Sequence, residues 1–179
     1  MNKRNIALFI SAHLYAALGV GFGCYPFDIQ TLKSIYICEL IITAIAIIFI
    51  GLEDNKTLKV SWRNTALYFY LIIPPIASGM HSGALVEQLI YYLPGLAFAA
   101  VMIIYSFKTG RGGADRDIGI LSLIPFPMIT VLSLIPSLLI SIIATAKRKQ
   151  KYPFLFPFSI VFGVLAVTQL AMMIGQVMI

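Results

Sequence analysis

Long apolar segments separated by short polar stretches run along the whole chain. Each segment has, or approaches, the roughly 20 residues that an α-helix needs to cross a bilayer. The apolar residues within a segment are continuous and do not alternate with polar ones, unlike the strands of a membrane barrel. The pattern therefore predicts an all-α membrane protein, a polytopic helical bundle of six to seven transmembrane segments. The apolar segments cover approximately residues 6–26, 35–52, 65–80, 88–107, 118–146 and 154–178.

The fifth segment is too long for one ordinary span and contains two prolines, Pro125 and Pro127. Proline removes a backbone donor and interrupts a helix. We therefore expect two helices, over 115–125 and 128–146, joined by a tight turn. The first would rise only ~16 Å, against an apolar bilayer core of about 30 Å, and would be a half-span. Helix length alone leaves open whether residues 115–146 cross once or twice.

Composition supports a single membrane-embedded domain over residues 1–179. The chain is 60% hydrophobic and 11% charged, whereas a soluble domain has about 25% charged residues. No polar stretch is long enough to fold as a separate domain. The N-terminal apolar run lacks a clear cleavage site, so we expect a retained anchor instead of a signal peptide.

The positive charges predict the orientation of the chain. The net charge of +6 is better explained by basic cytoplasmic loops than by nucleic-acid binding. With a cytoplasmic N-terminus and seven crossings, only Lys33 faces outward; a single crossing by 115–146 would place the basic cluster 147–151 outside. We therefore expect a multi-pass cell-membrane protein with cytoplasmic catalytic loops. The inner basic residues are then Lys3, Arg4, Lys56, Lys59, Arg63, Lys108, Arg111, Arg116, Lys147, Arg148, Lys149 and Lys151.

The metal-binding residue types are too sparse to indicate a metal or a cofactor. Cys24 and Cys38 form no C-x-x-C pair, and His13 and His81 are far apart in the sequence. Buried inert thiols and a packed or hydrogen-bonded His13 are the expected roles. The sequence therefore predicts neither a metal site nor a cofactor.

Two aspartates lie at cytoplasmic helix ends in this topology. Asp54 follows the second apolar segment, and Asp115 follows the glycine pair Gly112 and Gly113. Each has a structural alternative: Asp54 as a solvated loop acid, and Asp115 as the N-cap of the short helix. Two crossings separate them, so they can meet on one side of the membrane. Asp28 is three crossings from Asp115 and cannot join them.

A pair of close carboxylates suits peptide hydrolysis. Because two like charges disfavour double ionisation, the pair holds one shared proton. One carboxylate can then accept a proton from water while the protonated one polarises the scissile carbonyl. Glycines beside the pair would let an extended peptide approach the backbone closely. The sequence does not indicate which aspartate is the base.

Two further acids, Glu53 and Asp117, flank the proposed pair. They could attract a basic peptide electrostatically. The alternative is local charge balance beside Lys56 and Arg116. Glu39 enters the second apolar segment from outside, where it either reaches the outer interface or pairs within the bundle.

At these residues the chain resembles the prepilin and preflagellin peptidases, polytopic aspartyl proteases of the GxGD class. The stretch from Asp54 to Val60-Ser61-Trp62 is similar to the family's D-x-x-x-x-x-I-P-N element, with Val for Ile and Ser for Pro. Gly112-Gly113-Ala114-Asp115 resembles G-x-G-D, with Ala114 in place of the last glycine. Residues 153–158, Pro-Phe-Leu-Phe-Pro-Phe, resemble the P-F-x-P-F stretch that opens the last span, with one residue more.

The resemblance covers roughly residues 45–165 and implies a peptidase core over about 45–179, with residues 6–26 as an added N-terminal span. It implies an aspartic endopeptidase with catalytic Asp54 and Asp115, in a short archaeal-like form. The substrates would be prepilin- or preflagellin-like precursor peptides with a basic leader. The chain has no room for the cysteine-containing domain of many bacterial members, so no methyltransferase activity is expected.

Two other functions fit the sequence. A small polytopic transporter would use Glu39, His13 and the proline-broken helix, since broken helices line transport sites. A non-catalytic assembly subunit of a pilus machine would need neither aspartate. The identity of the precursor and the oligomeric state are left open by the sequence.

Overall fold

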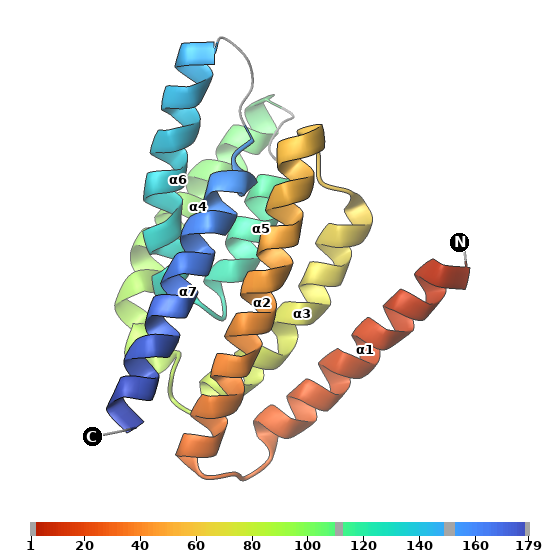
Figure 1. Ribbon diagram of the computed structural model, residues 1–179, viewed down its shortest axis with the longest axis vertical. Coiled ribbons are helices and arrows are strands. Elements are labelled where there is room, and N and C mark those ends of the chain that lie inside the picture. The colour runs from red at the N-terminus through yellow and green to blue at the C-terminus, as the bar shows by residue number, and fades with distance from the viewer. Residues whose placement is uncertain (1–2, 110–112, 149–152, 178–179) are drawn as a thin grey trace.

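The protein folds into helices that run up and down a bundle, as the computed structural model shows (Figure 1). The structure describes residues 3–109, 113–148 and 153–177. Within these ranges it contains helices and no strand, and 89% helix overall, so the all-α prediction is confirmed. The elements are α1 (Lys3–Cys24), α2 (Ile29–Thr57), α3 (Trp62–His81), the 3-10 helix η1 (Val86–Tyr91), α4 (Tyr92–Thr109), α5 (Gly113–Leu123), α6 (Pro127–Arg148) and α7 (Leu155–Val177).

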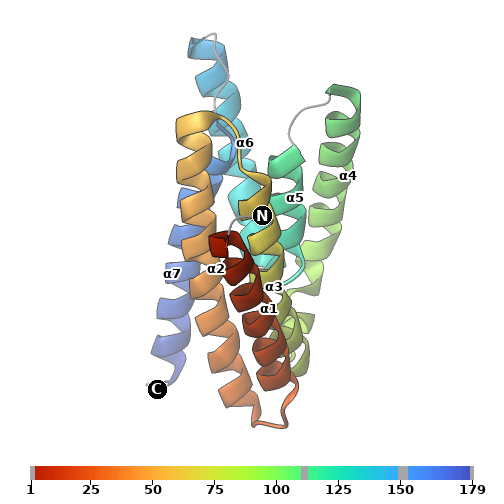
Figure 2. The same ribbon diagram turned by 90° about the vertical axis from the view of Figure 1, so that its right-hand side faces the viewer.

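Five of the helices form a closed ring. Helix α2 contacts α3 and α7, α5 contacts α3 and α6, and α6 packs on α7. Helix α1 lies outside the ring along α3, and α4 lies outside along α5 and α6 (Figures 1 and 2). Each ring helix contributes to the central core at least one apolar side chain of which at most 1% is exposed. These side chains include Ile47, Ile72, Ile118, Ile129 and Phe158.

Among the residues that the structure describes, five helical segments are long and apolar enough to cross a membrane. Helix α5 has only 11 residues, and α3 carries Pro74 and Pro75 in its interior; neither belongs to this set. The span predicted at 65–80 is thus a helix, but one of lower apolarity than the others. The five segments are Asn5–Cys24, Ile29–Thr57, Val86–Ile104, Pro127–Lys147 and Leu155–Met172.

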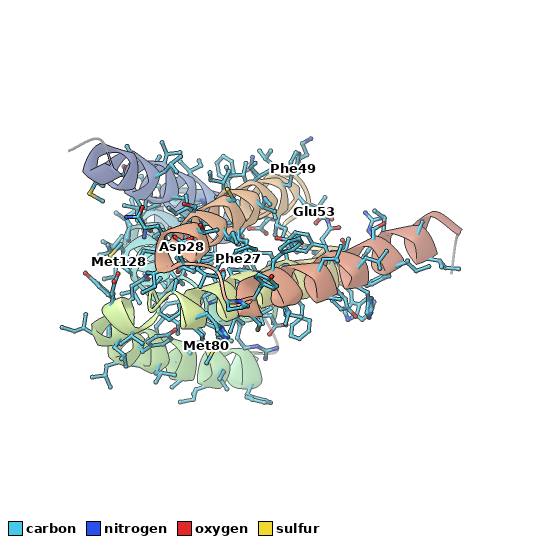
Figure 3. The ribbon with its side chains drawn as sticks, turned by 90° about the horizontal axis from the view of Figure 1, so that it is seen from below. Phe27, Asp28, Phe49, Glu53, Met80 and Met128 are labelled. Atoms are coloured by element: carbon cyan, nitrogen blue, oxygen red, sulfur yellow. The ribbon has the colours of Figure 1, made fainter. Side chains whose placement is uncertain are left out.

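Large apolar side chains also cover the outer surface of the bundle. Phe49 is 68% exposed, Leu93 is 76% exposed and Ile160 is 50% exposed. Figure 3 shows side chains projecting outward all around the helices, Phe49 among them. Soluble proteins avoid apolar surfaces of this extent, whereas a bilayer matches them. Together with the long apolar helices, this surface is that of a helical membrane protein.

The proline-rich break falls where the sequence predicts it. Helix α5 ends at Leu123 and α6 begins at Pro127, the first helical position, where proline is favoured. The end of the turn between them is buried: Phe126 is 1% exposed, and the Tyr36 hydroxyl donates to the Pro125 carbonyl. As a result α5 occupies only the upper part of the bundle (Figure 1). The beginning of α5 therefore lies at the same end of the molecule as the end of α2 and the beginning of α7.

Candidate active site

Asp54 lies in the last turn of α2 and is buried. The sequence indicates an apolar segment that ends near residue 52, with Asp54 as a possible loop acid. Instead, α2 continues to Thr57, and only 5% of Asp54 is exposed. The interpretation as a solvated loop acid is therefore wrong, because the polar residues after position 52 complete the helix.

The Asp54 carboxylate contacts the beginning of α7, 101 positions later in the chain. The backbone N–H of Leu155 donates to Asp54 Oδ2 at 3.0 Å, and the N–H of Phe156 hydrogen-bonds to the same carboxylate. The first N–H groups of a helix lack intrahelical partners and carry partial positive charge. Asp54 therefore satisfies these donors, and α7 in turn fixes the orientation of the carboxylate.

Gly51, one turn before Asp54, permits this contact. A Cβ atom at position 51 would lie 2.2 Å from Ser159 Oγ and 2.9 Å from the Leu155 carbonyl oxygen. Both distances are far below van der Waals contact. The absence of a side chain at Gly51 lets the first turns of α7 approach α2 closely enough for Leu155 to reach Asp54.

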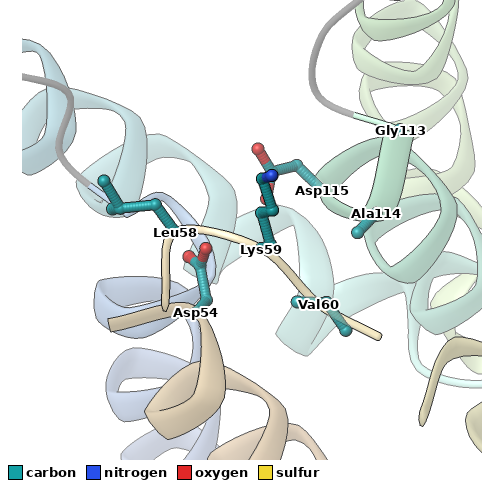
Figure 4. Close-up of a pocket in the computed structure, with 7 residues that line it drawn as sticks. All are labelled: Asp54, Leu58, Lys59, Val60, Gly113, Ala114 and Asp115. Carbon is teal, nitrogen blue, oxygen red and sulfur yellow. The ribbon is translucent and has the colours of Figure 1, made fainter. Parts of the chain in front are cut away.

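The chain reverses tightly after α2. Leu58 adopts a left-handed conformation with φ 52°, and its N–H donates to the Asp54 carbonyl at 2.7 Å. This cap usually employs glycine; for leucine the conformation costs about 1 kcal/mol. The Thr57 hydroxyl donates to the Lys59 carbonyl at 2.6 Å, and Ser61 caps α3. The turn places Lys59 at the cavity that Asp54 also lines (Figure 4).

Asp115 lies in the first turn of α5, outside the five helical segments that could span the membrane. Helix α5 begins at Gly113, two residues earlier than predicted, so Asp115 is inside the helix and is not its N-cap. Burial, and secondly the negative charge of Asp54, raise the pKa of Asp115 from 3.8 to about 7. An acid with a pKa of about 7 is about half protonated at neutral pH. The negative charge of Asp54 favours the protonated form of Asp115.

One cavity of about 290 Å³ is lined by both aspartates. Figure 4 shows it between the turn that follows α2 and the beginning of α5. A cavity of this volume can hold a small ligand or part of a larger one. The structure therefore brings the two candidate catalytic acids to one cavity. The lining residues are Asp54, Leu58, Lys59, Val60, Gly113, Ala114 and Asp115.

Of the two glycines expected to shape the substrate approach, Gly113 lines the cavity. A Cβ atom added there would meet nothing within 4 Å. Gly113 thus leaves open space beside Asp115 and is not required to relieve a clash. Gly112 lies outside the residues that the structure describes.

Glu53 and Asp117 are not among the residues that line the cavity. The Glu53 carboxylate accepts a hydrogen bond of 2.7 Å from the side chain of Asn64 and so links α2 to α3. Asp117 forms an ion pair of 2.6 Å with Arg116 and borders a separate cavity between α3 and α5. The contacts of Asp117 agree with local charge balance, whereas Glu53 has a partner that the sequence did not suggest.

Lys59 is a charged cavity residue that the sequence pattern did not assign to the site. It counted only as one of the inner positive charges, yet it lines the cavity with Asp54 and Asp115 (Figure 4). The one available signal was its position in the short stretch between Asp54 and the next apolar segment. Lys59 therefore adds a basic side chain to the lining of the cavity that both carboxylates share.

The residues of the transporter alternative have separate partners. The buried Glu39 accepts a hydrogen bond of 2.5 Å from Ser78 Oγ. His13 hydrogen-bonds to the Tyr70 hydroxyl at 3.1 Å and to the Phe9 carbonyl at 2.8 Å. Across the described ranges, no group of three or more His, Cys, Asp and Glu side chains is arranged to hold a metal ion.

The raised pKa of Asp115, caused by burial and secondly by the charge of Asp54, predicts a pH dependence of stability. The pKa of Asp115 is raised from 3.8 to about 7 in the folded state. The contribution of protonated Asp115 to the stability of the fold is therefore present in full below pH 3.8 and is lost as the pH rises through about 7. We expect the melting temperature in detergent to fall across this window in the wild type more than in Asp115→Asn.

Removal of the Asp54 charge provides the internal check. In Asp54→Asn the decline should be complete at a lower pH, because the second cause of the raised Asp115 pKa is gone. Melting temperatures that follow the same pH course in all three proteins would show that the two carboxylates do not interact.

Comparisons of the chain with protein-family models, with curated proteins and with solved structures found no match. The chemistry of the cavity is therefore the basis for a functional proposal.

Proposed function

We propose that this protein is a membrane aspartic endopeptidase of the prepilin-peptidase type. The observation that carries the proposal is that Asp54 and Asp115, 61 positions apart (115 minus 54), line one cavity and interact electrostatically. Buried acids in a membrane protein are costly and mark functional sites. Their placement together is the arrangement that aspartic peptide hydrolysis requires.

The reaction needs one proton shared between two carboxyl groups. Since the pKa of Asp115 is about 7 and is raised partly by the charge of Asp54, the singly protonated pair is populated near neutral pH. One carboxylate accepts a proton from a water molecule, and the oxygen of that water attacks the scissile carbonyl carbon. The other carboxyl group donates its proton to the carbonyl oxygen. Collapse of the tetrahedral species then releases the amine of the new N-terminus.

The proposed topology places this chemistry at the cytoplasmic face. Twelve of the thirteen basic residues fall on one side when the chain passes seven times through the bundle with α5 as a half-length pass. The ends of α2 and α4 and the beginnings of α5 and α7 lie together at that end (Figure 1). A cytoplasmic site meets precursors before export, so the proposed substrates are pilin-like or archaellin-like precursors with a basic leader.

The proposal is tested with purified protein in detergent and a synthetic precursor peptide that joins a basic leader to an apolar segment. We expect mass spectrometry to find two fragments whose masses sum to that of the peptide plus one water. The added water identifies hydrolysis. An intact peptide after prolonged incubation, with a protein that retains its thermal transition, would contradict the proposal.

Glu39→Gln separates the peptidase from the transporter alternative. Glutamine keeps the size of the side chain and can still accept from Ser78, the partner of Glu39. Because Glu39 lies 15 positions before Asp54 on the same helix, ~22 Å away along its axis, we expect peptide cleavage within about twofold of wild type. Loss of cleavage in this variant, with both aspartates intact, would move the functional site to Glu39.

A further inference from the structure

We propose that the first turn of α7 makes Asp54 the general base of the pair and leaves Asp115 as the general acid. The backbone amide of Leu155 holds the Asp54 carboxylate in its ionised form, which makes Leu155 a positioning residue. This inference rests on the proposed peptidase function and adds to it the separate roles of the two acids.

The hydrogen bonds of the two aspartates differ. Asp54 accepts from the N–H of Leu155 at 3.0 Å and from that of Phe156. Backbone N–H groups that donate to a carboxylate favour it over the carboxylic acid. Within the described parts of the chain, the Asp115 carboxyl group has no such donor. The proton of the pair is therefore favoured on Asp115.

The charged groups around Asp54 come from three elements. Glu53 precedes it on α2, while Lys59 and Asp115 face it from the following turn and from α5. Helix α7 meets it with Leu155 and Phe156, which carry no side-chain charge. The backbone of α7 is therefore the element that distinguishes Asp54 from Asp115 by hydrogen bonding.

With these roles each proton has a defined path. Asp54 takes one proton from the attacking water, and Asp115 gives its proton to the carbonyl oxygen of the scissile peptide. When the tetrahedral species collapses, the proton on Asp54 passes to the departing nitrogen. The proton on the oxygen returns to Asp115, so the pair ends the cycle as it began. The peptide and one water become an acid and an amine, with no other reactant.

The Leu155→Pro substitution tests the role of the amide directly. Leu155 is the first residue of α7, where the N–H has no intrahelical partner and proline is well tolerated. The substitution therefore removes the donor to Asp54 without removing a helical hydrogen bond. Because the Leu155 side chain is 1% exposed, Leu155→Ala is the matched control: it loses the side chain and keeps the amide.

We expect the acid limb of the pH profile of kcat to move upward by about one pH unit in Leu155→Pro, the order expected for one hydrogen bond to a carboxylate. The acid limb should stay in place in Leu155→Ala, even where packing lowers its maximal rate. The alkaline limb, set by the proton on Asp115, should stay in place in both. Movement of the alkaline limb alone, or equal profiles in both variants, would overturn the assignment.

Infrared titration without substrate separates this inference from the proposed function. The titration is made in a Glu39→Gln background, because Glu39 is a second buried acid. In that background we expect a carboxylic-acid band that titrates near pH 7, is missing when Asp115→Asn is added, and titrates at lower pH when Asp54→Asn is added. A band that is missing in Asp54→Asn would reverse the roles. The expected bands without peptide cleavage would support the protonation order and refute the peptidase.

Discussion

Replacement of either Asp54 or Asp115 by asparagine is expected to lower kcat for precursor cleavage by ~10³-fold or more, the upper part of the range for loss of general acid–base catalysis. Asparagine has nearly the shape of aspartate but can neither accept the proton of water nor supply one to the carbonyl. Both side chains line the same cavity, so each loss should be equally severe. The measurement is the initial rate of product formation, with protein level in the membrane determined in parallel.

Asp28→Asn is the matched control for the aspartate variants. Asp28 caps α2, with its carboxylate accepting from the Thr31 N–H at 3.0 Å, and asparagine caps a helix about as well. Figure 3 shows Asp28 and Glu53 toward opposite ends of α2. We expect full cleavage in Asp28→Asn. A large loss there, or full activity in Asp54→Asn, would show that the wrong acids have been paired.

Gly51→Ala is expected to cause the second-largest loss. The new methyl group would lie 2.6 Å from Ser159 Cβ and 2.9 Å from the Leu155 carbonyl oxygen, so α7 must move away from α2. Overpacking of this kind typically costs ~1–3 kcal/mol of stability. The movement also increases the distance between the Leu155 amide and the Asp54 carboxylate. We expect a lower melting temperature and at least a tenfold lower rate of cleavage.

Gly21→Ala provides the control for this substitution. Gly21 lies in α1 with nothing within 4 Å of an added Cβ, and it has the same gain in helix propensity, about 1 kcal/mol. Its melting temperature and rate should equal or exceed those of the wild type. Equal behaviour of the two alanine variants would mean that the close approach of α2 and α7 does not position Asp54.

The helical architecture could be predicted because the bilayer imposes it. Long apolar runs and the prolines at 125 and 127 are local signals, and they locate the helices and the break between α5 and α6. The ends of helices are less well determined, because polar residues are compatible with a last helical turn as well as with a loop. For this reason the burial of Asp54 inside α2 could not be foreseen.

The partners of the site residues depend on tertiary packing and not on local pattern. The contact of Asp54 with Leu155 joins positions 101 apart and uses a backbone amide, which any residue except proline provides. Lys59 faces the cavity because Leu58 adopts a left-handed conformation. The presence of a leucine in the sequence does not predict that conformation. The sequence identifies the two acids as candidates, but their surroundings depend on the tertiary fold.

The most direct test of the central claim, that Asp54 and Asp115 act as one catalytic unit, is a double-mutant cycle. It compares kcat/KM for precursor cleavage in the wild type, Asp54→Asn, Asp115→Asn and the double variant. Residues that act as a unit have strongly non-additive effects, so the double variant should be about as slow as either single variant. Losses that multiply, or a single variant with wild-type kcat/KM, would contradict the claim.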